Sequence, residues 1–422
     1  MKRTAIIGTG IAGLGCAHFL HRRDSLTLYE KNSYAGGHTN TVTVPEGDRQ
    51  VTMDTGFMVF NQVTYPNLTR LFRKLNVAVK PANMSFSVQH LPTRLEFCGS
   101  SLNHLFAQRK NLISPRFWKM IWQINRFNSE AVEALANPWY QNYTLEEYVR
   151  ERGYGEDFFN FYLVPMSSAV WSTPPELMRQ FPAVALLRFF HNHGFLGLHT
   201  QHPWLTVVNG AKTYVEELTD PFRNQIRLRC GAAAVRRENG RVKVTDAAGV
   251  TEEFDRVIFA SHADETLQML ADSDGQEKTL LGKFKYQPNT ALLHTDASVM
   301  PRTKRCWSAW NYRIDFAKDG TIRPSTIYWM NRLQGVSDRE NYFVSINGEE
   351  AVNPDRVLKR IQYEHPVFSL GAIAAQSELP KLNQRMTGIY FCGSYFRHGF
   401  HEDAFTSALD LCHLLTGERL WS

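Results

Sequence analysis

Apolar and polar residues in the first thirty positions follow the order expected of a strand, a helix and a second strand. Residues 4–7 form a short apolar run, residues 11–20 carry a helical pattern, and residues 25–29 form another apolar run that ends at Glu30. A basic start followed by an apolar stretch also describes a secretory signal peptide. A signal peptide has no reason to be followed by a second strand and an acid, so we favour the strand–helix–strand interpretation.

The glycines between the first strand and the helix are Gly8, Gly10 and Gly13. In a G-x-G-x-x-G pattern, the first glycine permits a tight turn, the second lets the backbone approach a pyrophosphate, and the third lets the helix pack close to the strand. The N–H groups of Ile11 and Ala12 at the helix start then face the phosphates. Glu30 and the adjacent Lys31 follow the second strand, where an acid accepts hydrogen bonds from a ribose diol. The pattern therefore predicts a dinucleotide site.

Further apolar runs complete this arrangement later in the chain. Residues 256–260 read as a buried strand, and residues 388–394 read as a strand that ends in glycine. A helical pattern follows over residues 404–415. Alternating strands are predicted at residues 225–228 and 241–245, with Asn239 and Gly240 as a hairpin turn.

Composition narrows the class of protein. The 422 residues include 43% hydrophobic and 21% charged residues, which excludes a disordered or fibrous chain. A net charge of +6 is too mild and too dispersed to favour a nucleic-acid partner. The six cysteines are widely spaced without a C-x-x-C pair, so we expect free thiols and a cytoplasmic protein. The sequence shows no apolar run of membrane-spanning length.

A second glycine pair decides the cofactor. Gly36 and Gly37 follow soon after Glu30, and the sequence resembles that of flavin-containing amine oxidases and phytoene desaturases. The resemblance implies FAD lying along these glycines, with the closing strand and helix near the flavin. A plain turn is the alternative for the glycine pair. The chain has no second G-x-G-x-x-G, and no cysteine stands at the place in the closing motif where amine oxidases with covalent flavin attach it. We therefore expect non-covalent FAD and no separate nicotinamide site.

The resemblance implies a set of further cofactor-binding residues beyond the first motif. They are Gly36, Gly37, His38, Thr55, Gly56, Phe57, Ala232, Gly393, Ser394, His401, Glu402, Asp403 and Ala404. Many relatives carry an acid where Ser394 stands, which puts that contact in question. The acids at 402 and 403 are also compatible with ordinary capping of a helix.

The resemblance also implies an α/β fold in which a Rossmann-type FAD-binding domain is interleaved with an α+β substrate domain. The FAD-binding domain is predicted to comprise residues 1–75, 205–265 and 380–422. The substrate domain is predicted to comprise residues 76–204 and 266–379. Residues 181–198 and several tryptophans are rich in aromatic side chains, most of which we expect in the core. Part of this set is expected to line a long apolar tunnel.

Residues 105–127 carry five positive charges and no acid among aromatic and aliphatic residues. Two interpretations stay open: an interfacial helix on anionic lipid, or an amphipathic helix with a solvated charged face. The first implies peripheral contact with the inner face of the cytoplasmic membrane.

Histidines form two candidate functional positions in the sequence. His191, His193, His199 and His202 cluster in sequence, but flavin chemistry requires no metal, so we predict no metal site. His294 stands six positions after Pro288, where amine oxidases carry a lysine near the flavin. It is our candidate catalytic residue, with an ordinary strand histidine as the alternative.

The closing motif, residues 391–395 with 399–403, resembles a bacterial branch of FAD proteins associated with modified fatty acids. Its relatives include methylated acyl-chain desaturases and fatty-acid double-bond isomerases. We therefore expect an FAD-dependent oxidoreductase that takes a hydride from an apolar acyl chain, free or in a phospholipid, to give desaturation or double-bond rearrangement. The alternatives are an amine oxidase and a lipid-binding flavoprotein without turnover.

Overall fold

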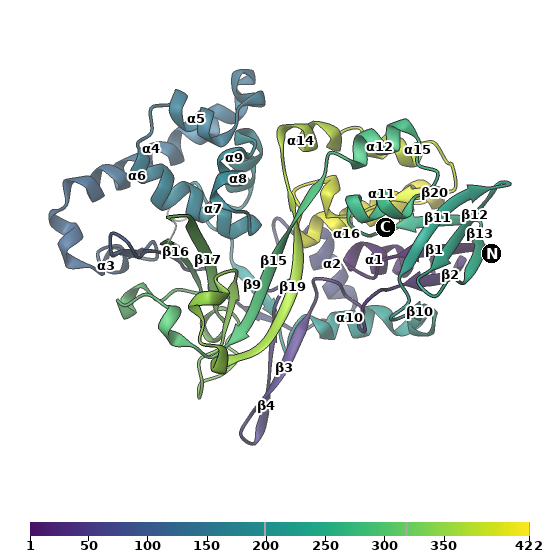
Figure 1. Cartoon of the computed structure of the whole chain (residues 1–422), viewed down its shortest axis with the longest axis horizontal. Coiled ribbons are helices and arrows are strands. Elements are labelled where there is room, and N and C mark those ends of the chain that lie inside the picture. Colours follow the sequence, from purple (N-terminus) through teal and green to yellow (C-terminus); the bar gives the residue numbers. More distant parts are fainter. Residues whose placement is uncertain (198–199, 317–319, 422) are drawn as a thin grey trace.

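Figure 1 shows the computed structural model of the chain, which describes residues 1–197, 200–316 and 320–421. A five-stranded parallel sheet takes its strands from both ends and the middle of the sequence, in the order β10-β2-β1-β14-β20. The strands are β1 (Lys2–Ile7), β2 (Asp24–Tyr29), β10 (Ile226–Arg227), β14 (Arg256–Phe259) and β20 (Ile389–Phe391). Ile6 of β1 lies between Leu28 of β2 and Ile258 of β14, and all three are buried, as expected of a sheet covered on both faces.

Two helices pack together over this sheet. They are α1 (Ile11–Leu20) and α16 (His401–Thr416). A Cβ atom added at Gly15 would lie 2.9 Å from the ring of Phe405, so a glycine in α1 allows the close approach of α16. The beginning and the end of the chain are thereby joined in one layer.

The predicted hairpin is present, but its strands differ from the prediction. A three-stranded antiparallel sheet contains β11 (Ala232–Glu238), β12 (Arg241–Asp246) and β13 (Thr251–Phe254). Asn239 and Gly240 make the turn with positive φ angles of 51° and 75°. The partner of β12 is therefore β11, whereas β10 at residues 226–227 joins the parallel sheet beside β2. Alternation alone did not distinguish these two strands.

The other large layer is a seven-stranded mixed sheet in the order β19-β15-β18-β17-β16-β7-β8. Its strands are β7 (Phe86–His90), β8 (Leu95–Cys98), β15 (Lys285–His294), β16 (Trp310–Phe316), β17 (Ile322–Trp329), β18 (Phe343–Ile346) and β19 (Val357–Val367). The long strands β15 and β19 form the edge of this sheet that lies toward the parallel sheet (Figure 1).

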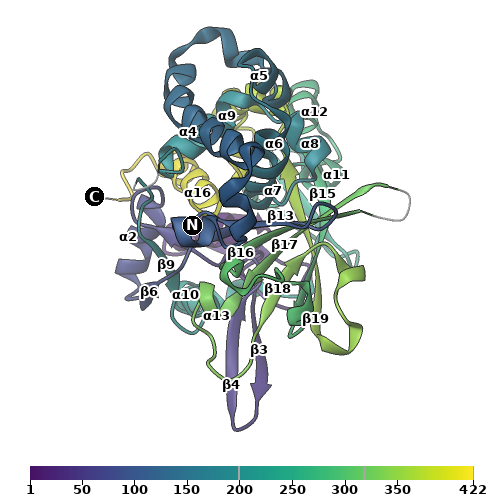
Figure 2. The ribbon, with the colours of Figure 1, turned by 90° about the vertical axis from the view of Figure 1, so that its left-hand side faces the viewer.

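Helices cover one side of this sheet (Figure 2). They are α4 (Pro115–Ala136), α5 (Leu145–Glu151), α6 (Glu156–Phe158), α7 (Val164–Trp171), α8 (Pro175–Arg179) and α9 (Ala183–Asn192). A hairpin of β3 (Thr41–Glu46) and β4 (Arg49–Asp54) projects on the opposite side. The smaller elements are β5 (Phe60–Asn61), α2 (Pro66–Lys74), β6 (Val79–Pro81), β9 (Trp204–Val207), α10 (Lys212–Thr219), α11 (Ala263–Met269), α12 (Gly275–Leu281), α13 (Met330–Leu333), α14 (Leu370–Gln376) and α15 (Leu379–Gln384).

The basic segment at residues 105–127 is not one helix. It contains the end of α3 (Leu102–Leu105), a 3₁₀ turn η1 (Arg109–Ile113) and the start of α4. Ser114 begins α4 by accepting a hydrogen bond from the N–H of Phe117 at 3.3 Å, and Pro115 occupies the first turn. No helix of the described residues is both long and apolar enough to cross a membrane. The predicted domain boundaries stay a prediction, although the parallel sheet draws its strands from the three segments assigned to FAD.

Candidate functional site

One large cavity joins the parallel sheet to the mixed sheet. Its volume is about 1550 Å³, and its lining extends from the glycine loop after β1 to residues of α4, α7 and β16. A pocket for one small ligand typically measures about 300–1,000 Å³. The cavity therefore has room for a cofactor and for a second molecule beside it.

The glycine loop lies at one end of the cavity. Gly8 has a φ of +98°, and a Cβ atom there would lie 2.9 Å from the carbonyl oxygen of Ala260. A Cβ atom at Gly13 would lie 2.0 Å from the carbonyl oxygen of Gly8, whereas one at Gly10 would meet open space. Gly10 forms a parallel bridge with Gly36, so the two glycine segments run side by side. Each glycine thus has the geometry that its predicted role requires.

The start of α1 is open toward this end of the cavity. Gly10, Ile11 and Ala12 line it, the first turn of α1 has no acid, and no side chain of the described residues caps it. Its N–H groups and the positive end of the helix dipole suit the pyrophosphate of a dinucleotide.

Glu30 is buried at the end of β2 and lines the same part of the cavity. One carboxylate oxygen accepts hydrogen bonds from the N–H and hydroxyl of Thr9 at 3.1 and 2.5 Å. The other accepts two bonds from Asn32 at 2.8 Å. Glu30 therefore holds the glycine loop in place. These four bonds occupy the acceptor sites of the carboxylate, so a ribose diol would share an oxygen with Thr9 or Asn32.

Most of the sequence-predicted cofactor residues line this one cavity. They are Gly8, Gly10, Ile11, Ala12, Glu30, Lys31, Gly36, Gly37, His38, Thr55, Gly56, Phe57, Ala232, Gly393, Ser394, His401 and Ala404. Gly13 lies behind the loop, where its role is close packing. Glu402, Asp403 and His294 are not among the lining residues.

The acids at 402 and 403 cap helices instead of facing the cavity. Glu402 accepts hydrogen bonds at 2.9 Å from the N–H groups of Asn67 and Leu68, at the start of α2. Asp403 accepts one at 2.9 Å from the N–H of Phe400, at the start of its own helix. Burial raises the pKa of Asp403 to about 7. The prediction that both bind the cofactor is therefore corrected: they fix α16, whose first residue, His401, lines the cavity.

His294 is placed away from the cavity, at the end of β15. It is fully buried, its Nε2 lies 2.8 Å from the hydroxyl of Ser345, and its Nδ1 accepts the N–H of Asp296 at 3.2 Å. Burial lowers its pKa to about 4. The proposed position near the flavin is thus not supported, and His294 is an ordinary strand histidine with both ring nitrogens bonded.

The histidine cluster around α9 also has local partners. His193 is buried, bonds through Nδ1 to the carbonyl oxygen of Phe189 at 2.9 Å and stacks on its ring at 3.9 Å. His202 bonds to the carbonyl oxygen of Asn192. His199 and Leu198 lie outside the described residues. Within the residues that the structure does describe, His191, His193 and His202 are not part of a metal-ligand group.

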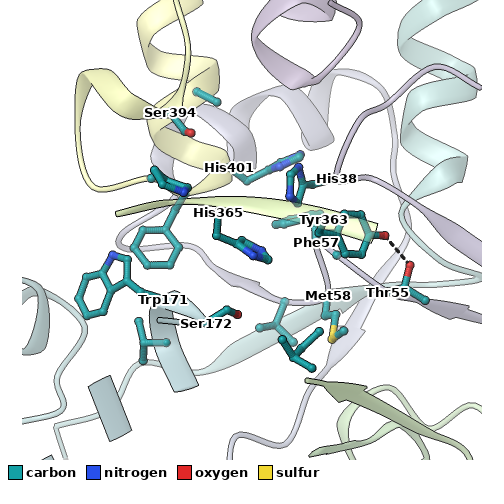
Figure 3. Close-up of a pocket in the computed structure, with 18 of the residues that line it drawn as sticks. His38, Thr55, Phe57, Met58, Trp171, Ser172, Tyr363, His365, Ser394 and His401 are labelled. Atoms are coloured by element: carbon teal, nitrogen blue, oxygen red, sulfur yellow. Dashed lines mark hydrogen bonds between the residues drawn. The ribbon is translucent and has the colours of Figure 1, made fainter. Parts of the chain in front are cut away.

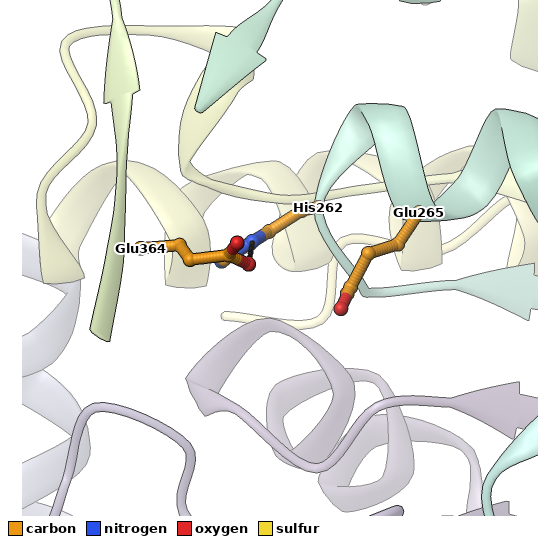
Figure 4. Close-up of side chains that lie close together, drawn as sticks. All are labelled: His262, Glu265 and Glu364. Carbon is orange, nitrogen blue, oxygen red and sulfur yellow. Dashed lines mark ion pairs between the residues drawn. The ribbon is translucent and has the colours of Figure 1, made fainter. Parts of the chain in front are cut away.

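Another group of three side chains has metal-ligand reach (Figure 4). Donor atoms of His262, Glu265 and Glu364 all lie within 4.8 Å of one another. Lys31 already neutralises Glu265 at 2.5 Å, and His262 lies 3.7 Å from the carboxylate of Glu364. Lys31 and Glu265 are thus an ion pair at the dinucleotide end of the cavity, whereas burial lowers the pKa of His262, whose ring meets Glu364 in its neutral form.

Aromatic and imidazole rings line the middle of the cavity (Figure 3). His401 stacks on Phe57 with ring centroids 3.9 Å apart, and its Nε2 lies 2.6 Å from the hydroxyl of Tyr214. Burial lowers the pKa of His401 to about 3, so its ring is neutral at physiological pH. The buried Nε2 of His38 has no hydrogen-bond partner among the described residues. An unpaired buried nitrogen beside Gly37 is what a site for a polar cofactor would present.

His365 on β19 is a cavity residue that the sequence reasoning missed. The N–H of Thr290 donates to Asn347 Oδ1 at 3.1 Å, Asn347 Nδ2 donates to Asn289 Oδ1 at 2.8 Å, and Asn289 Nδ2 reaches His365 Nδ1 at 2.8 Å. Because the backbone N–H fixes the orientation of both amides, His365 Nδ1 accepts and its Nε2 carries the proton. Burial lowers the pKa of His365 to about 4. A neutral N–H donor is thereby presented beside the cavity.

Beyond these rings the lining is mainly apolar, with Asn125 and Asn128 of α4 among it. Trp171, Phe189 and Phe400 form an aromatic group with centroid distances of 4.7 to 5.7 Å. The far end is lined by Phe97, Leu105, Ile121, Ile124, Tyr162, Met166, Val170, Trp310 and Tyr328. These residues come from segments far apart in sequence, so no local sequence motif predicts that they line one cavity.

Comparison with known proteins assigns the family. The family model described as "Flavin containing amine oxidoreductase" matches residues 11–305, which is more than half of the chain. The protein belongs to the flavin-containing amine oxidoreductase family. It is therefore a flavoprotein oxidoreductase whose cofactor is FAD, with a Rossmann-type FAD-binding domain and a substrate domain. A comparison with curated proteins found no match.

Solved structures share this fold at low sequence identity. A CLA-producing fatty acid isomerase from P. acnes is 13% identical, with a TM-score of 0.69 over 98% of this chain and 99% of that one. A variant of putrescine oxidase is 12% identical, with a TM-score of 0.69 over 99% of both chains. A proposed protoporphyrinogen oxidase from Exiguobacterium sp. 255-15 is 15% identical, with a TM-score of 0.68 over 98% of both chains. At these identities the likeness establishes the fold alone.

Proposed function

We propose that this flavoprotein oxidises an apolar acyl chain, by desaturation or by moving a double bond. The observation that carries the proposal is the apolar far end of the cavity, which continues from the cofactor residues past the aromatic group to α4 and α7. A hydrocarbon chain gains free energy there by burial of apolar surface, about 0.8 kcal/mol for each CH₂ group. A protein of similar fold, the CLA-producing fatty acid isomerase, acts on a fatty acid, which supports a substrate of this kind.

The distribution of charge in the cavity argues against an amine. Among the described lining residues, the carboxylates are Glu30, Glu265 and Glu364, which all lie at the dinucleotide end. The aromatic group around Trp171 would suit an amine as well as an acyl chain. A protonated amine at the far end would nevertheless have no carboxylate beside it. An amine oxidase is therefore the second candidate.

The chemistry divides between cofactor and chain. FAD, when bound, supplies an acceptor for two electrons and one hydrogen, and dioxygen is the acceptor class that we expect to restore it. The protein places one carbon of the acyl chain within about 3–3.5 Å of the reacting atom and excludes water through its apolar lining. Loss of a proton from the adjacent carbon completes desaturation, whereas return of the hydrogen to another carbon gives an isomer. The fixed Nε2–H of His365 is one hydrogen-bond donor beside the cavity.

We also propose that the protein reaches its substrate at an anionic membrane surface. Leu112, Ile113, Trp118 and Trp122 are exposed, with 87% of Ile113 accessible. Lys110 and Lys119 lie beside them, exposed and without a carboxylate partner among the described residues, whereas Arg116 already pairs with Asp157. Exposed tryptophans next to free cations suit the headgroup boundary of a bilayer.

The same helix connects this surface to the cavity. Trp118 and Trp122 are exposed on α4, whereas Ile121 and Asn125 line the cavity. Positions 118, 121, 122 and 125 share one side of a helix. An acyl chain leaving a bilayer at this edge therefore has a short path to the apolar end.

Lipid analysis of cells with and without the gene tests the proposed function. We expect acyl chains in the expressing cells that lack two hydrogens, or chains of equal mass with a moved double bond. A control strain expressing the Gly10→Val variant separates catalysis from the presence of the protein. An unchanged lipid profile together with turnover of a primary amine would contradict the proposal and favour the second candidate.

A further inference from the structure

A small basic pocket, which we call the tryptophan pocket, lies beside the main cavity. It measures about 350 Å³ and is lined by His104, Lys304, Arg305, Trp307, Trp329, Arg332 and Asn341. Arg332 lines the tryptophan pocket and also the main cavity. Because Arg332 is exposed, the main cavity reaches the surface here. One molecule can therefore occupy both spaces.

The walls of the tryptophan pocket are fixed by hydrogen bonds. The rings of Trp307 and Trp329 stand at 90° with centroids 5.4 Å apart. Trp307 Nε1 donates to the carbonyl oxygen of Pro301 at 2.8 Å, and Trp329 Nε1 donates to Asn341 Oδ1 at the same distance. With both indole N–H groups engaged, the rings present apolar surfaces to the pocket.

Three cations converge on these walls. Lys304 Nζ lies 5.3 Å from the ring centroid of Trp307, and Arg332 Nε donates to Ser85 Oγ at 3.3 Å. Lys304, Arg305 and Arg332 form no ion pair with any carboxylate of the described ranges 1–197, 200–316 and 320–421. Like charges gathered without a counter-charge raise the local potential and favour an anion between them.

We propose that the tryptophan pocket binds the phosphate group of a phospholipid whose acyl chain enters the main cavity. This inference rests on the proposed function, because it assumes an acyl substrate. Arginine and lysine are the donors that match phosphate oxygens. The neighbouring α3 carries Leu102, which is 75% exposed, and His104, which lines the pocket. An exposed apolar residue next to a phosphate site has the arrangement expected at a headgroup boundary.

Calorimetric titration of the FAD-loaded protein with dihexanoyl phosphatidylglycerol, used below its micelle concentration, tests the proposal. We expect the Lys304→Gln/Arg305→Gln variant to bind this lipid about tenfold or more weakly, since it loses charge-assisted hydrogen bonds. Lys304→Arg in the otherwise native chain should bind normally. The matched control is Lys278→Gln/Lys283→Gln, which removes the same charge near α12, on the far side of the molecule from α3 (Figure 1).

The remaining arms identify the source of the phosphate. Inorganic phosphate and hexanoate should each bind much more weakly than the lipid. Equal affinity for inorganic phosphate would overturn the lipid assignment, and equal weakening by the control variant would reduce the effect to overall charge. Lipid affinity unaffected by the pocket variant would also overturn it. Flavin reduction by a free fatty acid should persist in the pocket variant. If no acyl compound reduces the flavin while the pocket variant still loses lipid binding, the proposed function fails and the pocket assignment stands.

Discussion

The two ends of the main cavity are built in different ways. At the dinucleotide end, backbone groups of two adjacent glycine segments and the buried Glu30 form the lining. At the apolar end, side chains from α4, α7, β8, β16 and β17 meet although they are far apart in sequence. The first end depends on the absence of side chains at fixed positions, and the second depends on side-chain volume. The two ends should therefore respond differently to substitution.

The largest effect is expected at Gly13, in the glycine loop. A Cβ atom there would lie 2.0 Å from the carbonyl oxygen of Gly8, so Gly13→Ala forces α1 away from β1. We expect a loss of more than about 4 kcal/mol in the free energy of unfolding, the range of severe core disruption. Chemical denaturation measures it. Gly10→Ala is the matched control: its Cβ meets open space, so the protein should fold but bind FAD weakly.

Next in size is the effect of Glu30. Glu30→Gln keeps the shape of the side chain but removes the charge that accepts hydrogen bonds from Thr9 and that we expect to accept one from the ribose of FAD. FAD binding should weaken by roughly 1.5–3 kcal/mol, the usual value for charge-assisted bonds. Titration of the apoprotein with FAD measures the change. An unaltered FAD affinity would remove Glu30 from the site. In the same experiments the cofactor should be released intact by acid, because we expect non-covalent FAD.

The apolar end should tolerate added side-chain volume poorly, but such a change should not affect cofactor binding. Val170 lines that end, and Val170→Trp would fill part of it. We expect flavin content to stay normal while reduction by long acyl chains slows about tenfold or more, as expected when reacting groups are misplaced. Val132→Trp on the exposed face of α4 is the control. Equal rates in both variants would place the substrate elsewhere.

The pH dependence of stability should show that His294, unlike the histidines that line the cavity, affects folding and not flavin reduction. Because burial lowers the pKa of His294 to about 4, the unfolded state takes up a proton below about pH 6.5 that the folded state does not. The contribution of the neutral His294 to the free energy of unfolding is therefore complete at neutral pH, and it is lost as the pH falls from about 6.5 to 4. His294→Gln should reduce this slope by about 1.4 kcal/mol per pH unit while flavin reduction stays normal. Slower flavin reduction would restore His294 to the reaction.

The smallest effect is expected at the membrane surface. Each of Lys110 and Lys119 should contribute about 1 kcal/mol to binding of anionic vesicles. Lys110→Gln/Lys119→Gln should sediment less with phosphatidylglycerol vesicles at low salt, and high salt should weaken the native protein too. Arg116→Gln is the comparison, because Asp157 already neutralises Arg116. If sedimentation does not change with salt or with these substitutions, residues 105–127 are an ordinary packed region.

The same contrast explains what the sequence could predict. Gly8, Gly10, Gly13 and Glu30 lie close together in the sequence, so their spacing predicted the first strand–helix–strand unit and the dinucleotide end of the cavity. The roles of Glu402 and Asp403 were mistaken because a helix N-terminus offers the same composition for capping as for cofactor binding.

The rest of the site depends on tertiary pairing. His365 reaches the cavity because β19 pairs with β15 and because two asparagines orient its ring, and neither fact is visible in a local pattern. His294 was chosen from a spacing after Pro288, but the strand carries it beyond the end of the cavity. The basic segment was expected as one helix, whereas Ser114 and Pro115 begin a new one.

The central claim is that an acyl chain at the apolar end passes electrons to the cofactor at the other end. The most direct test is anaerobic mixing of the FAD-loaded protein with monounsaturated phospholipid or fatty acid, followed by flavin absorbance and mass analysis of the lipid. The account predicts loss of the oxidised flavin spectrum with a product lacking two hydrogens, or an isomer formed while the spectrum recovers. Reduction by a primary amine, with every acyl compound recovered unchanged, would contradict it.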